Sequence, residues 1–99
     1  MARSSSHFPK NIREDLNLSQ QEFANLLGVN HITVFKWENE KYKNKPKGRP
    51  LSYIRLFDKT FTKIGDINKF PPIKETLDQK GPLWTIYEIQ KASMDYPSP

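Results

Sequence analysis

Apolar residues recur every three or four positions through the first two thirds of the chain, which is the spacing of amphipathic helices. The pattern predicts a short helix over residues 9–16, a second over 20–27 and a longer one over 50–64. Val34 and Trp37, three residues apart, predict a further helix that buries these two side chains and turns most of its others outward.

Capping and turn residues separate these helices. Ser19 and Glu22 have the spacing of a capping box, in which each side chain satisfies a backbone amide that a helix start leaves free. Gly28 allows a turn that a residue with a β-carbon would resist, and Asn30 can cap the helix that follows. Gly65 is the expected end of the long helix.

Beyond Gly65 the pattern allows two interpretations, because three prolines interrupt the chain. Alternation of apolar and polar residues along LWTIYEIQ fits a strand that pairs with IKETL in a β-hairpin. The spacing of Leu83, Ile86 and Ile89 fits a helix instead, and we favour the helix.

We therefore expect an all-α fold of four to five short helices over residues 9–65, with an extension over 66–99 that is helical or a β-hairpin. Residues 1–8 contain three consecutive serines and no periodicity, so we expect a flexible arm there, with Arg3 able to touch a partner. The tail YPSP is expected to be disordered. One small domain of 99 residues buries only about 60 to 65 per cent of its unfolded surface, so contacts with a partner subunit would matter.

Charge and composition narrow the function classes. The net charge is +5, and residues 1–63 hold 12 Lys or Arg against 6 Asp or Glu, which favours a polyanionic partner. The run KYKNKPKGR, residues 41–49, has five cations, no acid, and a proline and a glycine that oppose a regular helix, so it predicts a basic loop.

The chain has no cysteine, which excludes disulfides and thiolate metal sites. The sequence lacks a phosphate-binding glycine loop, an HExxH and a Gly-x-Ser-x-Gly motif, so we expect no enzyme, no metal site and no cofactor.

The sequence has neither a run of 18 apolar residues nor the pattern of a signal peptide. We therefore expect a cytoplasmic protein with no membrane partner, associated with the nucleoid when it is bound to DNA.

The segment LNLSQQEFANLLGVNHITVFKWENEK resembles the Cro-like, XRE-type helix-turn-helix family of phage repressors and bacterial regulators. Ala24 lies where two helices would approach closely, Gly28 follows four residues later in the turn, and Val34 follows six residues after that. The resemblance covers about residues 10–63. It implies a protein that binds double-stranded DNA.

The resemblance also implies roles for individual residues. It places the start of the third helix in the major groove, where the side chains facing base edges would be His31, Ile32, Thr33, Phe35 and Lys36. The residues expected at phosphates are Gln20, Asn39, Lys41, Lys43, Lys45 and Lys47. The Gln20 amide could also brace a residue of the third helix, and Tyr42 could stack on the sugar backbone. Arg13 and Glu38 match positions that the family often joins in a structural ion pair. Glu40 stands where many members have glycine, which leaves the path of the following loop open.

These expectations lead to a transcriptional repressor that binds a palindromic operator as a homodimer. One module neutralises few phosphates, whereas two modules about 34 Å apart address half-sites one helical turn apart. The alternative is an antitoxin of a toxin–antitoxin pair, in which residues 66–99 bind a toxin protein while the helix-turn-helix autoregulates the operon.

Overall fold

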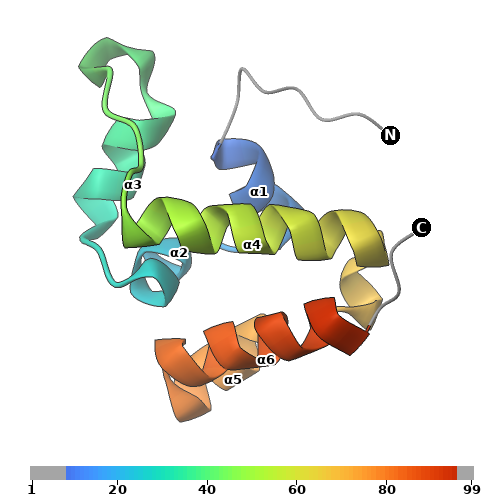
Figure 1. Ribbon diagram of the computed structural model, residues 1–99. Coiled ribbons are helices and arrows are strands. Elements are labelled where there is room, and N and C mark those ends of the chain that lie inside the picture. Colours follow the sequence, from blue (N-terminus) through green and yellow to red (C-terminus); the bar gives the residue numbers. More distant parts are fainter. Residues whose placement is uncertain (1–8, 96–99) are drawn as a thin grey trace.

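The computed structural model describes residues 9–95, apart from the side chain of Glu40 (Figure 1). The elements in chain order are α1 (Lys10–Asp15), α2 (Gln20–Leu27), α3 (His31–Glu38), the 3-10 helix η2 (Glu40–Tyr42), α4 (Arg49–Ile64), the 3-10 helix η3 (Ile67–Lys69), α5 (Ile73–Lys80) and α6 (Pro82–Asp95). No strand occurs among residues 9–95, so the predicted all-α fold is confirmed. The expected arm 1–8, with Arg3, and the expected tail 96–99 lie outside the described residues.

Residues 9–65 contain four α-helices, as predicted, and the extension contributes two more, α5 and α6. Its β-hairpin alternative is wrong, and its helical alternative is confirmed. The predicted inward stripe of α6 needs one correction, because Leu83 is 74% exposed whereas Ile86 and Ile89 are buried. Thr85 is buried instead, and its hydroxyl donates to the Gly81 carbonyl at 2.9 Å, which satisfies the polar group that burial removes from water.

The helix boundaries follow from local chemistry. The Ser19 hydroxyl accepts from the Glu22 amide at 3.1 Å and the Glu22 carboxylate accepts from the Ser19 amide at 2.8 Å, so the capping box of α2 is confirmed. Gly28, at φ 73°, ends α2 in the left-handed region, and the Asn30 side chain accepts from the Ile32 amide at 2.9 Å at the start of α3. These three signals set a tight turn between α2 and α3.

The long helix α4 crosses the middle of the molecule (Figure 1). Helices α5 and α6 lie side by side along one side of it, and α1 lies on the other side. Helix α3 stands near the end at which α4 begins, with its axis steeply inclined to α4.

One hydrophobic core joins all six α-helices. Phe23 and Phe57 meet edge to face in this core, with ring centroids 6.5 Å apart. The buried apolar residues of the core are Ile12, Leu16, Leu18, Phe23, Ala24, Leu26, Leu27, Val34, Ile54, Phe57, Phe70, Ile73, Ile86 and Ile89. Because the last four of these belong to the extension or its approach while the others belong to α1–α4, the extension completes the core.

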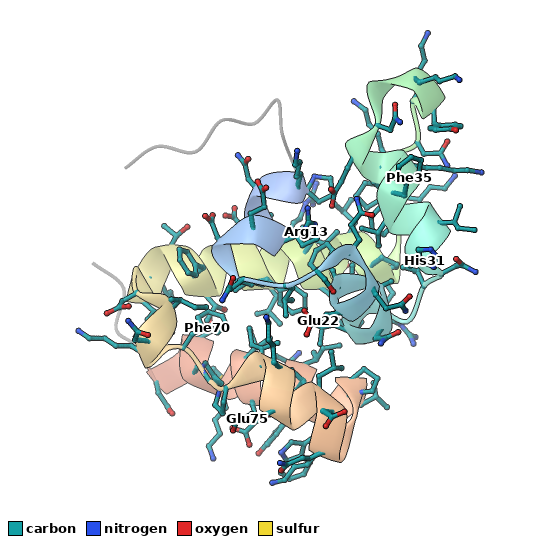
Figure 2. The ribbon with its side chains drawn as sticks, turned by 180° about the vertical axis from the view of Figure 1, so that it is seen from behind. Arg13, Glu22, His31, Phe35, Phe70 and Glu75 are labelled. Carbon is teal, nitrogen blue, oxygen red and sulfur yellow. The ribbon has the colours of Figure 1, made fainter. Side chains whose placement is uncertain are left out.

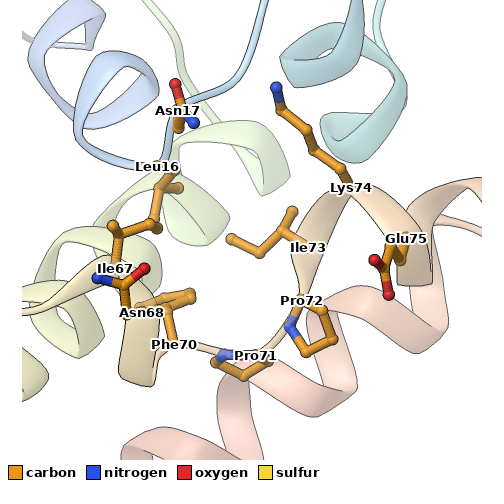
Figure 3. A pocket seen from close by; sticks show the side chains of 10 residues that line it. All are labelled: Leu16, Asn17, Ile67, Asn68, Phe70, Pro71, Pro72, Ile73, Lys74 and Glu75. Atoms are coloured by element: carbon orange, nitrogen blue, oxygen red, sulfur yellow. The ribbon is translucent and has the colours of Figure 1, made fainter.

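Two polar contacts also connect the extension to the preceding helices. The Lys63 ammonium donates to the Ser93 carbonyl at 3.2 Å, and the Lys74 ammonium lies 3.8 Å from the Glu22 carboxylate. A groove of about 460 Å³ marks the same junction (Figure 3). Its walls include Phe70, Pro71 and Ile73, with Leu16 and Asn17 of the α1–α2 turn on the opposite side.

Replacing Ile89 by alanine tests whether α6 is integral to the core. Ile89 is fully buried, so we expect Ile89→Ala to lower the free energy of unfolding by about 2 to 5 kcal/mol. Urea unfolding followed by circular dichroism measures it as one cooperative transition. The matched control is Gln79→Ala on the exposed surface of α5, which should change stability by less than about 0.5 kcal/mol. Equal midpoints for the two variants would contradict the packing of α6.

A second test concerns the capping box. The hydrogen bond from the Ser19 backbone amide holds the pKa of Glu22 below its ordinary value, and the Lys74 charge adds to this effect. A lowered folded-state pKa stabilises the protein above the unfolded-state pKa, and this contribution is lost as pH falls through the folded-state value. Glutamine retains the accepting oxygen but does not titrate, so stability should fall less for Glu22→Gln than for the wild type below about pH 4.3. Thermal melts from pH 7 to pH 3 measure the difference, and parallel curves would contradict it.

Candidate nucleic-acid interface

Helix α3 presents two different faces to its surroundings. Val34 is fully buried against the core, and Trp37 packs against the same core while remaining partly exposed. On the opposite face, Ile32 is 51% exposed and Phe35 is 42% exposed. Large apolar side chains at such exposed positions are typical of a binding surface when they cluster.

The five residues expected to face base edges share this outer side of α3. His31, Ile32 and Phe35 are exposed, whereas Thr33 and Lys36 are partly buried at its margins. Figure 2 shows His31 and Phe35 on the outer side of α3, across the molecule from Phe70 and Glu75. The outer face of α3 therefore lies away from the extension.

A polar cluster ties this helix to α1 and α2. The Arg13 Nε donates to Glu38 Oε2 at 2.6 Å and its Nη2 donates to Glu38 Oε1 at 3.0 Å, a bidentate pair. The Arg13 and Glu38 side chains are only 14% and 5% exposed. The remaining Arg13 Nη1 donates to the Leu18 carbonyl at 2.7 Å. The two side chains that the family resemblance pairs thus meet at the end of α3.

Gln20 joins the same cluster. Its Nε2 donates to Glu38 Oε1 at 3.1 Å, so the side chain braces α3 from the start of α2. This is the second of the two roles that the resemblance implies for Gln20. A phosphate contact by its side-chain amide would have to use the remaining donor capacity of that group.

The basic loop follows α3 directly. Lys41, Lys43, Lys45 and Lys47 are all exposed, as is Arg49, where α4 begins. Asn39 is partly buried, and its side-chain oxygen accepts from the Lys41 amide at 3.1 Å, which caps η2. Asn39 therefore retains only its side-chain NH₂ for a phosphate.

Local geometry shapes the path of this loop. The single turn η2 continues the chain beyond α3, Lys43 adopts φ 55°, and Pro46 is buried although its neighbours are exposed. The buried Pro46 packs the loop against the protein while the lysine side chains on either side of it remain exposed.

An aromatic contact at the exit of α3 escaped the sequence analysis. The Phe35 and Tyr42 ring centroids lie 6.1 Å apart. The Lys36 ammonium lies 5.6 Å from the Tyr42 ring centroid and the Lys41 ammonium 6.0 Å from it, both within the range of cation–π attraction. Tyr42 thus contacts the outer face of α3. The sequence carries no signal for this, because the contact depends on the turn η2.

Comparison with known proteins agrees with this geometry. Residues 10–51 match the family model of the helix-turn-helix, the HTH_3 family of XRE-type domains. Residues 10–51 are a Cro-like, XRE-type helix-turn-helix. This helix-turn-helix is a module of DNA-binding transcriptional regulators, a class that is not typically enzymatic.

The match spans α1 to the first turn of α4. No curated protein and no solved structure matches the chain. Within residues 9–95, the helices are too short or too polar to cross a bilayer.

The cluster around Glu38 provides a test of how the helix-turn-helix is held together. Arg13→Ala should lower the free energy of unfolding by about 3 kcal/mol, because it leaves the largely buried Glu38 carboxylate without its cation. The ranking of DNA sequences should change little, since Arg13 lies behind the outer face of α3. Thermal denaturation and DNA competition measure the two effects.

The matched control is Arg55→Ala, which removes the same charge from an exposed position of α4. Its melting temperature should stay close to that of the wild type. An Arg13→Ala protein as stable as the Arg55→Ala protein would contradict the structural role of the pair.

Proposed function

We propose that this protein is a transcriptional repressor that binds a palindromic operator as a dimer, with α3 of each subunit in the major groove. The observation that carries the proposal is the exposed outer face of α3 within a matched helix-turn-helix. While Ile32 and Phe35 stay exposed to water, the protein does not obtain the favourable free energy of burying their apolar surface. Seating α3 in the major groove would cover that surface.

The side chains of this face suit the chemistry of base edges. Lys36 can donate to the N7 and O6 acceptors of guanine, and Thr33 can bond to a base or a phosphate. Ile32 and Phe35 can contact the methyl group of thymine, and His31 begins the helix at the point of entry into the groove. We assign base reading to these five residues.

Phosphate contacts flank this face. Four exposed lysines of the basic loop would neutralise DNA phosphates, release their counterions and fix the position of the protein along the duplex. These are Lys41, Lys43, Lys45 and Lys47. The Asn39 amide can donate to a phosphate beside them. Gln20 contributes mainly by bracing Glu38 and thereby fixing α3. We assign DNA binding as a whole to residues 9–65, and partner binding to residues 66–99.

Pairing and repression follow from energetics. One module makes few phosphate contacts and binds weakly, whereas two linked modules gain effective concentration on half-sites about 34 Å apart. A dimer seated on a promoter excludes the polymerase by occupying its site. Such a repressor acts on the nucleoid, in the cytoplasm.

The antitoxin alternative assigns the extension a toxin protein as its partner. The observation in its favour is the exposed apolar side of α6, which offers a protein-binding surface outside the matched region. A toxin gene adjacent to this gene, and a complex that forms through residues 66–99, would support the alternative over simple repression.

Fluorescence anisotropy tests the proposal directly. The duplexes are DNA from upstream of the gene, a scrambled control and a pool selected from random sequence, each titrated at several salt concentrations. Preference for a two-fold symmetric sequence supports the proposal. Equal affinity for all duplexes overturns sequence-specific repression, and the absence of binding at low salt overturns DNA binding.

Lys36→Ala should relax base preference at one base pair of each half-site. The expected loss on the preferred sequence is about 1 to 3 kcal/mol, with little change on DNA that already lacks the contacted guanine. Competition against single-base variants of the operator measures it. A uniform loss on every sequence would reassign Lys36 to a phosphate.

Lys43→Ala is the matched control, because it removes the same charge from the exposed loop. It should weaken binding on all sequences alike and reduce the slope of log affinity against log salt by about 1 per subunit. An unchanged slope would remove Lys43 from the phosphate-contacting set.

A further inference from the structure

Exposed large apolar side chains fall into two groups in the described part of the chain. Ile32, Phe35 and Tyr42 lie at the helix-turn-helix, where the proposed contact with DNA accounts for their exposure. Four others lie together on α6: Leu83, Trp84, Tyr87 and Met94. Only Ile67 in η3 stands apart from both groups. The α6 group lies outside the residues proposed to contact DNA, so a different partner would have to cover it.

The exposed residues of α6 follow a regular spacing. Leu83, Tyr87, Gln90 and Met94 are separated by four, three and four residues, which is the spacing of a coiled-coil seam. All four are exposed, and Leu83 and Met94 reach 74% and 84%. We call these four residues the α6 seam.

The opposite face of α6 is already used inside the molecule. Thr85, Ile86, Ile89 and Ser93 are buried against neighbouring helices, which include α2, α4 and α5. Helix α6 therefore has two faces suited to packing, and the chain covers only one of them.

Aromatic side chains contact one another beside the seam. Trp84 and Tyr87 lie with ring centroids 5.5 Å apart, and the Lys80 ammonium lies 5.0 Å from the Trp84 ring centroid. Both rings remain exposed despite these contacts. Exposed Trp and Tyr side chains of this kind are typical of protein interfaces, where they often contribute much of the binding energy.

We propose that the α6 seam binds the α6 seam of a second copy of this chain, with the two helices antiparallel. The two-fold axis would pass between Glu88 and Ile89. Leu83 would then face the partner subunit's Met94, and Tyr87 would face the partner subunit's Gln90. The pairing locates the interface of the proposed dimer, and in this respect it rests on the proposed function.

Charge decides between the antiparallel and the parallel arrangement. In the antiparallel pair, Lys91 lies beside the partner subunit's Trp84, whose ring face attracts a cation. Asp95, the last residue of α6, lies beside the positive N-terminal end of the partner subunit's α6. A parallel pair would lack both contacts, because it places the two N-terminal ends of α6 side by side and leaves Lys91 and Asp95 at the far end. The seam is therefore self-complementary only in the antiparallel direction.

Sedimentation equilibrium of the full chain without DNA tests the pairing. The wild type should dimerise, and Tyr87→Glu should raise the dimer dissociation constant about tenfold or more, because it removes an aromatic anchor and sets a charge in the seam. Gln79→Glu, on the exposed surface of α5, is the matched control and should leave the constant unchanged. Circular dichroism checks that both variants remain folded, as exposed positions should allow.

Disulfide trapping tests the direction, since the natural chain contains no cysteine. A mixture of the single variants Leu83→Cys and Met94→Cys should form a crosslink between the two positions under mild oxidation. Each variant alone should crosslink far less. Dominant crosslinks between two copies of Leu83→Cys would overturn the antiparallel register.

The outcomes separate this inference from the proposed function. A wild type that stays monomeric at every concentration, yet prefers one DNA sequence, overturns the pairing of α6 and leaves sequence-specific DNA binding standing. A dimer that Tyr87→Glu dissociates, in a protein that binds no DNA, supports the pairing and overturns repression. If the protein dimerises, but Tyr87→Glu leaves the dissociation constant unchanged and Leu83→Cys does not crosslink to Met94→Cys, the interface lies elsewhere and the inference is overturned.

Discussion

The ion pair between Arg13 and Glu38 sets the position of everything that this protein would present to DNA. It joins the first helix of the helix-turn-helix to the last turn of the third, and Gln20 adds a contact from the second. Three helices that are too short to be stable alone are thereby linked through the Glu38 carboxylate, in addition to their packing in the core. The cost of burying that carboxylate is offset by the charge of Arg13 and by the three hydrogen bonds that the carboxylate accepts.

The outer face of α3 depends on this arrangement. In the proposed complex with DNA, a helix of eight residues would otherwise shift as Ile32 and Phe35 approach the groove, since Val34 and Trp37 alone give it a narrow buried stripe. The capped start at Asn30 and the braced end at Glu38 limit this freedom at both ends. Tyr42 then extends the face beyond the helix, where η2 brings it against Phe35.

Local signals were sufficient for most of the helix boundaries, because capping at Ser19 and the turn at Gly28 depend on neighbouring residues alone. The extension was harder to predict. Its alternating sequence also fits a strand, although the apolar spacing favours a helix, and packing against α2 and α4 stabilises the helix, which is a tertiary effect. The exposure of Leu83 is also a tertiary effect, whereas the contact of Tyr42 with Phe35 depends on the geometry of η2. The residues proposed to contact DNA follow from the family resemblance alone, because the fold shows only which side chains are exposed.

The shared core has a consequence for turnover. Ile86 and Ile89 of α6 pack in the same cluster as Phe23 and Phe57, so the extension cannot be lost without exposing the interior of the helix-turn-helix. A protease that cuts the connection between α5 and α6 would therefore unfold the DNA-binding part rather than release it intact. In the proposed repressor, a cut at Gly81 would therefore relieve repression irreversibly, with no need for a small-molecule inducer.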